Sequence, residues 1–181
     1  MSEGVEWALH SCVNLAWSVP GRAVSAARLA AWHDLPAAYL NKQLQALARA
    51  GIVTSTPGPR GGFRLARPLA DISLMDVVAA VEGPEEAFRC AEIRRRGPGG
   101  EPPAAEPAQS AESAESAESA ESAGPAQSAD SADCAIAHAM ARAELAWRRA
   151  LADQDLDGIR RQAERQAPEA PERLRAWLAA H

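Results

Sequence analysis

Apolar residues recur with helical spacing at the start of the chain. Residues 5–18 have apolar side chains at Val5, Leu9, Val13 and Ala16, with Trp17 beside Ala16. Their separation of three to four residues is typical of one buried face of an α-helix. Pro20 and Gly21 interrupt the pattern, and both residue types end helices. We therefore predict a first helix over residues 5–18.

Two further helices are predicted in close succession. Ser25 is a suitable N-cap for a short helix that extends to about Trp32, and Pro36 suits the first turn of a third helix. The inward-facing stripe of this third helix consists of Leu40, Leu44 and Leu47. Gly51 is its expected terminator. The pattern is that of a helix-turn-helix.

The pattern then changes to that of a β-hairpin followed by a helix. Residues 52–55 and 63–65 are short β-prone runs on either side of a turn rich in Gly and Pro at 57–62, which predicts two paired strands. Ser73 and Asp76 resemble a capping box at the start of a helix that ends near Glu82. We therefore predict a mainly α protein with a small β-hairpin wing, a winged helix-turn-helix, over residues 1–89.

The second half of the chain contains a low-complexity segment and a long amphipathic helix. Residues 97–133 are dominated by Ala, Ser, Glu, Pro and Gly; they cannot bury a core, which predicts disorder, with a transient helix as the alternative. The helical stripe that follows consists of Ile136, Met140, Ala143 and Trp147. We predict a loop with a low-complexity insertion over 90–133, a dimerisation helix over 134–152 that pairs with a second copy, and a C-terminal tail over 153–181 with short helices.

Charge is distributed unevenly along the chain. The net charge is -5, yet no Asp or Glu occurs between Leu35 and Ala70. The cations of that stretch are Lys42, Arg49, Arg60, Arg64 and Arg67. Because the electrostatic footprint of a DNA-binding protein is local, the acidic total does not exclude nucleic acid as a partner.

Nothing in the sequence predicts export or membrane insertion. The N-terminus lacks a basic region followed by an apolar stretch, and no segment offers about 20 consecutive apolar residues, so we expect a cytoplasmic protein. Its three cysteines are Cys12, Cys90 and Cys134. An odd number without an export signal favours thiols or metal ligands over a structural disulfide framework.

The outward face of the third helix has the chemistry of a DNA reader. If the leucine stripe faces the core, the residues facing outward are Ala38, Lys42, Gln45 and Arg49, flanked by Tyr39 and Gln43. Lys and Arg can neutralise phosphates or meet guanine edges, and Gln can bond adenine, while Arg60 on the wing can reach the backbone or minor groove. A solvated helix face is the alternative. The order of the elements and the absence of acids favour DNA.

Three segments also resemble a known family. Residues 36–44, 58–68 and 72–83 are similar to the bacterial winged-helix iron-sulfur transcription regulators, the family that contains IscR and NsrR, and the resemblance covers residues 4–90 and 134–152. It implies a homodimer that binds a palindromic operator in double-stranded DNA and represses transcription. Many members have Arg before the Gly-Pro of the wing, where this chain has Pro57, so the minor-groove role would pass to Arg60.

The same resemblance implies a metal centre. Many members present three cysteines after the fourth helix, whereas this chain has only Cys90 there. The chain is closest to a member whose [2Fe-2S] cluster is held by two Cys of one subunit and a Glu and a His of the other. The corresponding ligands are Glu6, His10, Cys90 and Cys134. Glu6 and His10 are four residues apart and so share a helix face, and an imidazole ligand raises the potential of such a cluster. Trp7, beside Glu6, is the bulky side chain expected to repack as a redox relay.

Other interpretations of these residues remain open. Cys90 and Cys134 could instead form a reversible disulfide or bind zinc without any cluster. Cys12 is expected to be structural, and His33 and His138 are weaker ligand candidates than His10. An enzyme with Cys-His nucleophilic chemistry is disfavoured because no catalytic motif is recognisable. A protein-binding scaffold built on the Ser-Ala-Glu segment is a further alternative.

Overall fold

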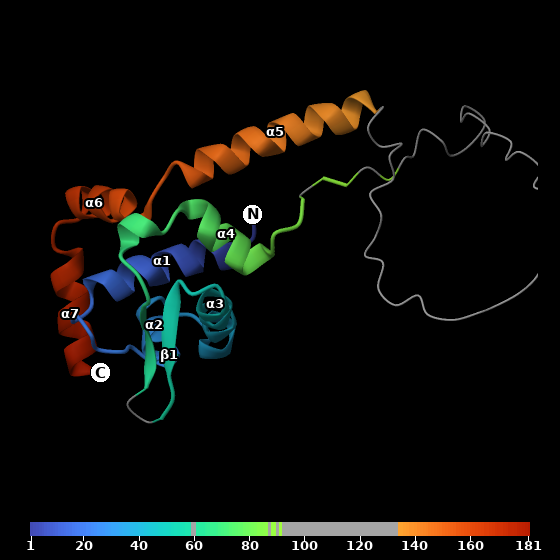
Figure 1. Cartoon of the computed structure of the whole chain (residues 1–181). Helices are drawn as coiled ribbons and strands as arrows, with labels where there is room; N and C mark the ends of the chain where they lie inside the picture. The colour runs from blue at the N-terminus through green and yellow to red at the C-terminus, as the bar shows by residue number, and fades with distance from the viewer. Residues whose placement is uncertain (59–60, 87, 90, 92–133) are drawn as a thin grey trace, which may run out of the picture. The chain divides into compact units, whose positions relative to one another are not determined.

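The computed structural model describes residues 1–58, 61–86, 88–89, 91 and 134–181. Its elements in chain order are α1 (Glu3–Trp17), α2 (Ala26–Trp32), α3 (Ala37–Arg49), β1 (Val53–Thr56), β2 (Gly62–Leu65), a 3-10 turn η1 (Leu69–Asp71), α4 (Leu74–Glu82), α5 (Ala135–Ala152), α6 (Leu156–Gln166) and α7 (Ala170–Ala180) (Figure 1). Residues 1–85 and 145–181 form one compact unit, and residues 86–144 form another. The mainly α fold with one antiparallel hairpin confirms the predicted winged helix-turn-helix.

The helix-turn-helix is built by the local signals that the sequence contains. The Ser25 hydroxyl accepts a hydrogen bond from the Arg28 backbone N–H at 3.3 Å and so caps α2. Asp34, in the turn between α2 and α3, has a φ of 54°, a conformation that Asp tolerates better than most residues. Helix α3 ends before Gly51, which takes a φ of 68°. The predicted helix boundaries are confirmed to within two residues.

The hairpin forms the wing and is joined to the segment before α2. Val53 pairs with Leu65 and Thr56 with Gly62 in the antiparallel register. Val24 and Phe63 exchange two backbone hydrogen bonds of 2.9 and 2.8 Å. A Cβ on Gly62 would lie 2.4 Å from the Val24 carbonyl oxygen, and the φ of Gly62 is 148°, so only glycine fits this contact. The wing is thus fixed to the helix-turn-helix by backbone pairing.

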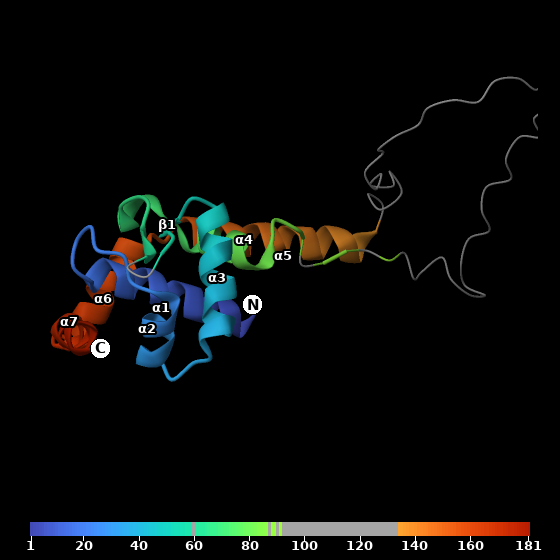
Figure 2. The same ribbon diagram turned by 90° about the horizontal axis from the view of Figure 1, so that it is seen from below.

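The core lies between α1 and the helix-turn-helix. Figures 1 and 2 show α1 crossing α2 and α3, and α1 packs on α3 and α4 while α2 packs on α3. The largest fully buried side chains of this layer are Leu29, Leu40, Leu44, Leu47, Ile52, Ile72 and Val77. Helix α4 begins with the predicted capping box, in which Ser73 and Asp76 bond each other's backbone N–H groups at 3.1 and 2.9 Å. The helix therefore starts where the sequence indicated.

The C-terminal residues form short helices, as the sequence predicted, but these helices pack into the core and are not a separate tail. Helices α6 and α7 both pack on α1, and Leu156, Leu174 and Leu178 are buried in the main core. Backbone bonds join the start of α6 to the region before α4: Leu156 N–H donates to the Ile72 carbonyl and Leu74 N–H to the Gln154 carbonyl, both at 2.9 Å. Residues 153–181 are therefore part of the winged-helix unit.

Helix α5 matches the predicted long amphipathic helix. None of its residues is buried. Its large apolar side chains are exposed by 67% (Ile136), 42% (Met140), 48% (Leu145) and 36% (Trp147). An apolar stripe of this size is unusual on a helix exposed to water.

Among the described residues, no helix is both long enough and apolar enough to cross a membrane.

A polar contact between α6 and α1 gives the fold an acid-sensitive element. The Trp17 indole N–H donates to Glu164 Oε1 at 2.8 Å, and Arg160 donates to the same oxygen at 2.6 Å. These bonds, that from Trp17 foremost, lower the pKa of Glu164 below its ordinary value of 4.5. The carboxylate therefore stabilises the fold above about pH 4.5, and this contribution disappears as the pH falls through the lowered pKa.

We expect Glu164→Gln to remove this pH dependence. The Gln side chain keeps an acceptor for Trp17 but cannot titrate, so the stability difference between wild type and variant should shrink between pH 6 and pH 3. Since Glu164 is one-third exposed, the difference at pH 6 should be no more than about 1 kcal/mol. Urea unfolding at several pH values measures it. A difference that stays constant down to pH 3 would show that the charge of Glu164 contributes nothing.

Candidate DNA-binding face and metal ligands

The outward face of α3 is placed by the buried leucines of the same helix. Leu40, Leu44 and Leu47 are 0% exposed. The exposed residues on the opposite side are Ala38, Lys42, Gln45 and Arg49. Separations of four, three and four residues align them along one side of the helix. The structure therefore brings these four predicted DNA-contacting residues together on one solvent-facing surface.

Gln43 does not lie on this face, contrary to the sequence-based interpretation. Its side chain is 7% exposed, and a Cβ on Gly4 would come within 2.8 Å of its Nε2 atom. Gln43 thus packs against the N-terminal turn of α1 and is removed from the DNA-contacting set. The spacing contained this signal, since position 43 follows Leu40 by three residues and precedes Leu47 by four. Tyr39 is half-buried at the edge of the face.

The cations of the wing have different environments. Arg64 on β2 is exposed, whereas Arg67 is held 3.4 Å from the carboxylate of Asp76, its Nη2 atom donating to Oδ2. Arg60, the predicted minor-groove residue, lies outside the described residues. Of the described wing cations, Arg64 is therefore the one oriented to solvent.

Helix α1 presents the predicted Glu and His ligands next to an aromatic cluster. Glu6 and His10 are both exposed. The Trp7 ring lies 6.1 Å from the His10 ring and 5.3 Å from the His33 ring, and the two imidazoles are 5.8 Å apart. Trp7 is half-buried, and its indole Nε1 is buried with no hydrogen-bond partner in the described part of the chain. The cluster connects α1 to the turn before α3.

The surroundings of His33 favour the neutral form of its imidazole. The Asn14 side-chain amide donates to His33 Nε2 at 2.7 Å. Partial burial, and next the neighbouring His10, lower the pKa of His33 below its ordinary value of 6.5. The predicted secondary role of His33 as a ligand is not favoured, because its Nε2 atom is already occupied by Asn14.

The three cysteines fall into different environments. Cys12 is 0% exposed, and burial raises its pKa to about 12, so its thiol stays protonated near neutral pH and is unsuited to redox or metal chemistry. Cys134 is buried at the start of α5, and His138 is exposed one turn later. Cys90 lies outside the described residues.

No group of three or more His, Cys, Asp and Glu side chains that could hold a metal ion occurs among the described residues of one chain. The predicted ligands Glu6 and His10 would by themselves supply only two donors. A complete ligand set would therefore require further side chains.

Comparisons with known proteins identify the family to which the chain belongs. A model of the Rrf2 family, described as iron-dependent transcriptional regulators, matches residues 1–162. Two relatives named as HTH-type transcriptional regulators are YwgB of Bacillus subtilis, 56% identical over 45 residues, and YffB of Lactococcus lactis, 36% identical over 89 residues. The matches cover 25% and 49% of this chain and 29% and 57% of those relatives, so the chain spans at most about half the length of these two proteins.

Solved structures show the same fold. A transcriptional regulator from Lactobacillus plantarum is similar with a TM-score of 0.59 and 20% identity, over 93% of both chains. IscR from T. potens is similar with a TM-score of 0.57 and 17% identity, over 92% of this chain and 90% of the other. The family match extends over most of the chain and the relatives are regulators. The chain therefore belongs to the Rrf2 family of transcriptional regulators and is not an enzyme.

Proposed function

We propose that this protein is a homodimeric regulator that acts in the cytoplasm and represses transcription from a palindromic operator. The observation that carries the proposal is the face of α3, where Ala38, Lys42, Gln45 and Arg49 are exposed together within a stretch that lacks acids. A helix of this kind fits the major groove, with Ala38 permitting close approach and the longer side chains reaching bases and phosphates. Arg60 on the wing would contact the backbone or minor groove.

Dimerisation through α5 would explain its exposed apolar stripe. Ile136, Met140 and Trp147 share one side of the helix and are 36–67% exposed, and a second copy of the same helix would remove them from water. Two copies related by a twofold axis would present two recognition helices, which matches the symmetry of a palindromic site.

We further propose that a [2Fe-2S] cluster is bound by Glu6 and His10 of one subunit and by Cys90 and Cys134 of the partner subunit. The exposed Glu6 and His10 share one face of α1. The indole N–H of Trp7 beside them finds no acceptor among the described residues, as expected at an incomplete site. Two thiolates, an imidazole and a carboxylate suit the two irons. When bound, the cluster would supply a reversible one-electron change in charge.

The residues around α1 provide a route from these ligands to the recognition helix. Trp7 contacts the rings of His10 and His33, and His33 is the C-cap of α2. Gly4 packs directly on Gln43 of α3. A shift of α1 would therefore be transmitted both to the turn before α3 and to α3 itself, and it would alter how the two recognition helices are spaced.

Visible spectra with iron and sulfide content test the cluster. We expect wild type purified without oxygen to be brown, and Glu6→Ala, His10→Ala, Cys90→Ala and Cys134→Ala each to lose or shift the spectrum. Matched controls are Glu3→Ala on α1, Cys12→Ala in the core and His138→Ala on α5, which should keep it. Trp7→Ala should keep the colour but weaken the redox dependence of DNA binding.

A wild-type protein without colour or iron would contradict the proposed cluster. A colourless wild type that takes up no iron would eliminate the cluster and leave a reversible Cys90–Cys134 disulfide or a zinc site. Mass spectrometry of the oxidised protein and zinc analysis distinguish these two.

A further inference from the structure

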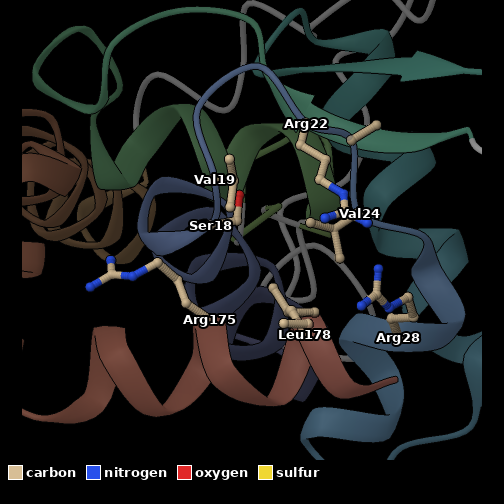
Figure 3. A pocket seen from close by; sticks show the side chains of 9 residues that line it. Ser18, Val19, Arg22, Val24, Arg28, Arg175 and Leu178 are labelled. Carbon is tan, nitrogen blue, oxygen red and sulfur yellow. The ribbon is translucent and has the colours of Figure 1, made fainter.

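A small cavity lies between the α1–α2 segment, α2 and α7, away from the proposed ligands and from the exposed face of α3. Its volume is about 40 Å³. The residues that line it are Ser18, Val19, Arg22, Ala23, Val24, Arg28, Arg175, Leu178 and Ala179 (Figure 3). Three are arginines and none is acidic, so the lining is cationic although the chain as a whole is acidic.

Two of these arginines have no carboxylate partner in the part of the chain that the structure describes. Figure 3 shows the guanidinium groups of Arg22 and Arg28 turned toward one another over Val24. Neither forms an ion pair within the described residues, and Arg28 Nε is buried without a hydrogen-bond partner there. Arg175 is used differently, since its Nη1 donates to the Trp17 carbonyl at 3.2 Å. Arg22 is exposed and Arg28 is half-buried, so the cost falls on the buried Nε of Arg28, which an anion between the two guanidinium groups would supply with an acceptor.

The position of the pair is fixed by the wing. Arg22 lies two residues before Val24, which is bonded to Phe63 of β2, and Arg28 is in the first turn of α2, where its backbone N–H bonds the Ser25 cap. The site is thus built on the elements that frame the wing and helix-turn-helix.

We propose that Arg22 and Arg28 form a phosphate-binding site. The cavity accepts one phosphoryl group but no whole metabolite, so the rest of the ligand must remain outside. Guanidinium groups bind such oxyanions through paired N–H donors. The phosphoryl group could belong to one of two molecules. One is the backbone of the operator DNA, an assignment that rests on the proposed function, and the other is a free phosphorylated small molecule.

Two measurements test the site and separate its sources. The first is the thermal stability of the DNA-free dimer titrated with inorganic phosphate, for wild type, Arg22→Gln/Arg28→Gln and the control Arg173→Gln, an exposed arginine on α7 outside the cavity. The second is operator binding by fluorescence anisotropy over a range of salt concentrations. Glutamine preserves the aliphatic stem, and circular dichroism verifies that each variant folds.

If the site binds a phosphate of the DNA backbone, the double variant should bind DNA about tenfold or more weaker than wild type. The slope of the logarithm of DNA affinity against the logarithm of salt concentration should also be reduced by about 1 to 2. A free-ligand source predicts that phosphate stabilises wild type and Arg173→Gln but not the double variant, with an unchanged salt slope. If the double variant equals wild type in both measurements, the site does not exist. If wild type binds no DNA, the proposed function fails, while the phosphate titration still decides the site.

Discussion

Leu156→Ala is expected to lower the free energy of unfolding by about 2–5 kcal/mol. Leu156 is 0% exposed and belongs to the main core, so truncation leaves a cavity that rigid neighbours cannot fill. The Leu156 N–H also donates a hydrogen bond to the Ile72 carbonyl. Truncation of the Leu156 side chain should therefore destabilise the region before α4 as well. Urea unfolding followed by circular dichroism measures the change.

The matched control for this prediction is Gln162→Ala, an exposed position on the same helix, which should change stability by less than about 0.5 kcal/mol. If Leu156→Ala is as mild as Gln162→Ala, then α6 is an appendage rather than part of the winged-helix core.

Lys42→Ala/Gln45→Ala/Arg49→Ala is expected to weaken operator binding by about 100-fold or more, since each lost base or phosphate contact costs about 1–3 kcal/mol. All three side chains are exposed, so the fold should be retained. Fluorescence anisotropy at fixed salt, with operator and scrambled duplexes, measures the loss. Lys42→Ala alone should weaken both duplexes if it contacts phosphate, and Gln45→Ala should weaken the operator selectively if it reads a base.

Arg165→Ala provides the control, because Arg165 is an exposed cation on α6, away from α3. It should bind operator like wild type. If the triple variant binds as tightly as Arg165→Ala, the outward face of α3 is not the DNA-reading surface.

The helix-turn-helix and wing were predictable because their signals are local. The Ser25 cap, Gly51 and the Ser73–Asp76 capping box each act within a few residues, and the structure contains all three. Helix α6 was not predicted, because Leu156 and Ile159 are its only large apolar residues. So narrow an apolar face resembles a polar tail until tertiary contacts are known.

The candidate site was predictable to the extent that it depends on one helix. Glu6 with His10, and Lys42 with Arg49, lie together because of helical spacing alone. The spacing from Leu40 and Leu47 already indicated that Gln43 is buried, but its contact with Gly4 of another helix could not be read from that spacing. The proposed pairing of Glu6 and His10 with Cys90 and Cys134 would involve two chains, and spacing within one chain carries no information about such a pairing.

The backbone bridge between Val24 and Phe63 limits the ways in which this protein can respond to a signal. With Gly62 pressed against Val24, the wing cannot swing independently of α2 without breaking two hydrogen bonds. Wing and recognition helix therefore behave as one rigid body within each subunit. In the proposed dimer, a signal would therefore act on the angle between the two wing-and-helix units, and we expect a single subunit bound to a half-site to be insensitive to that signal.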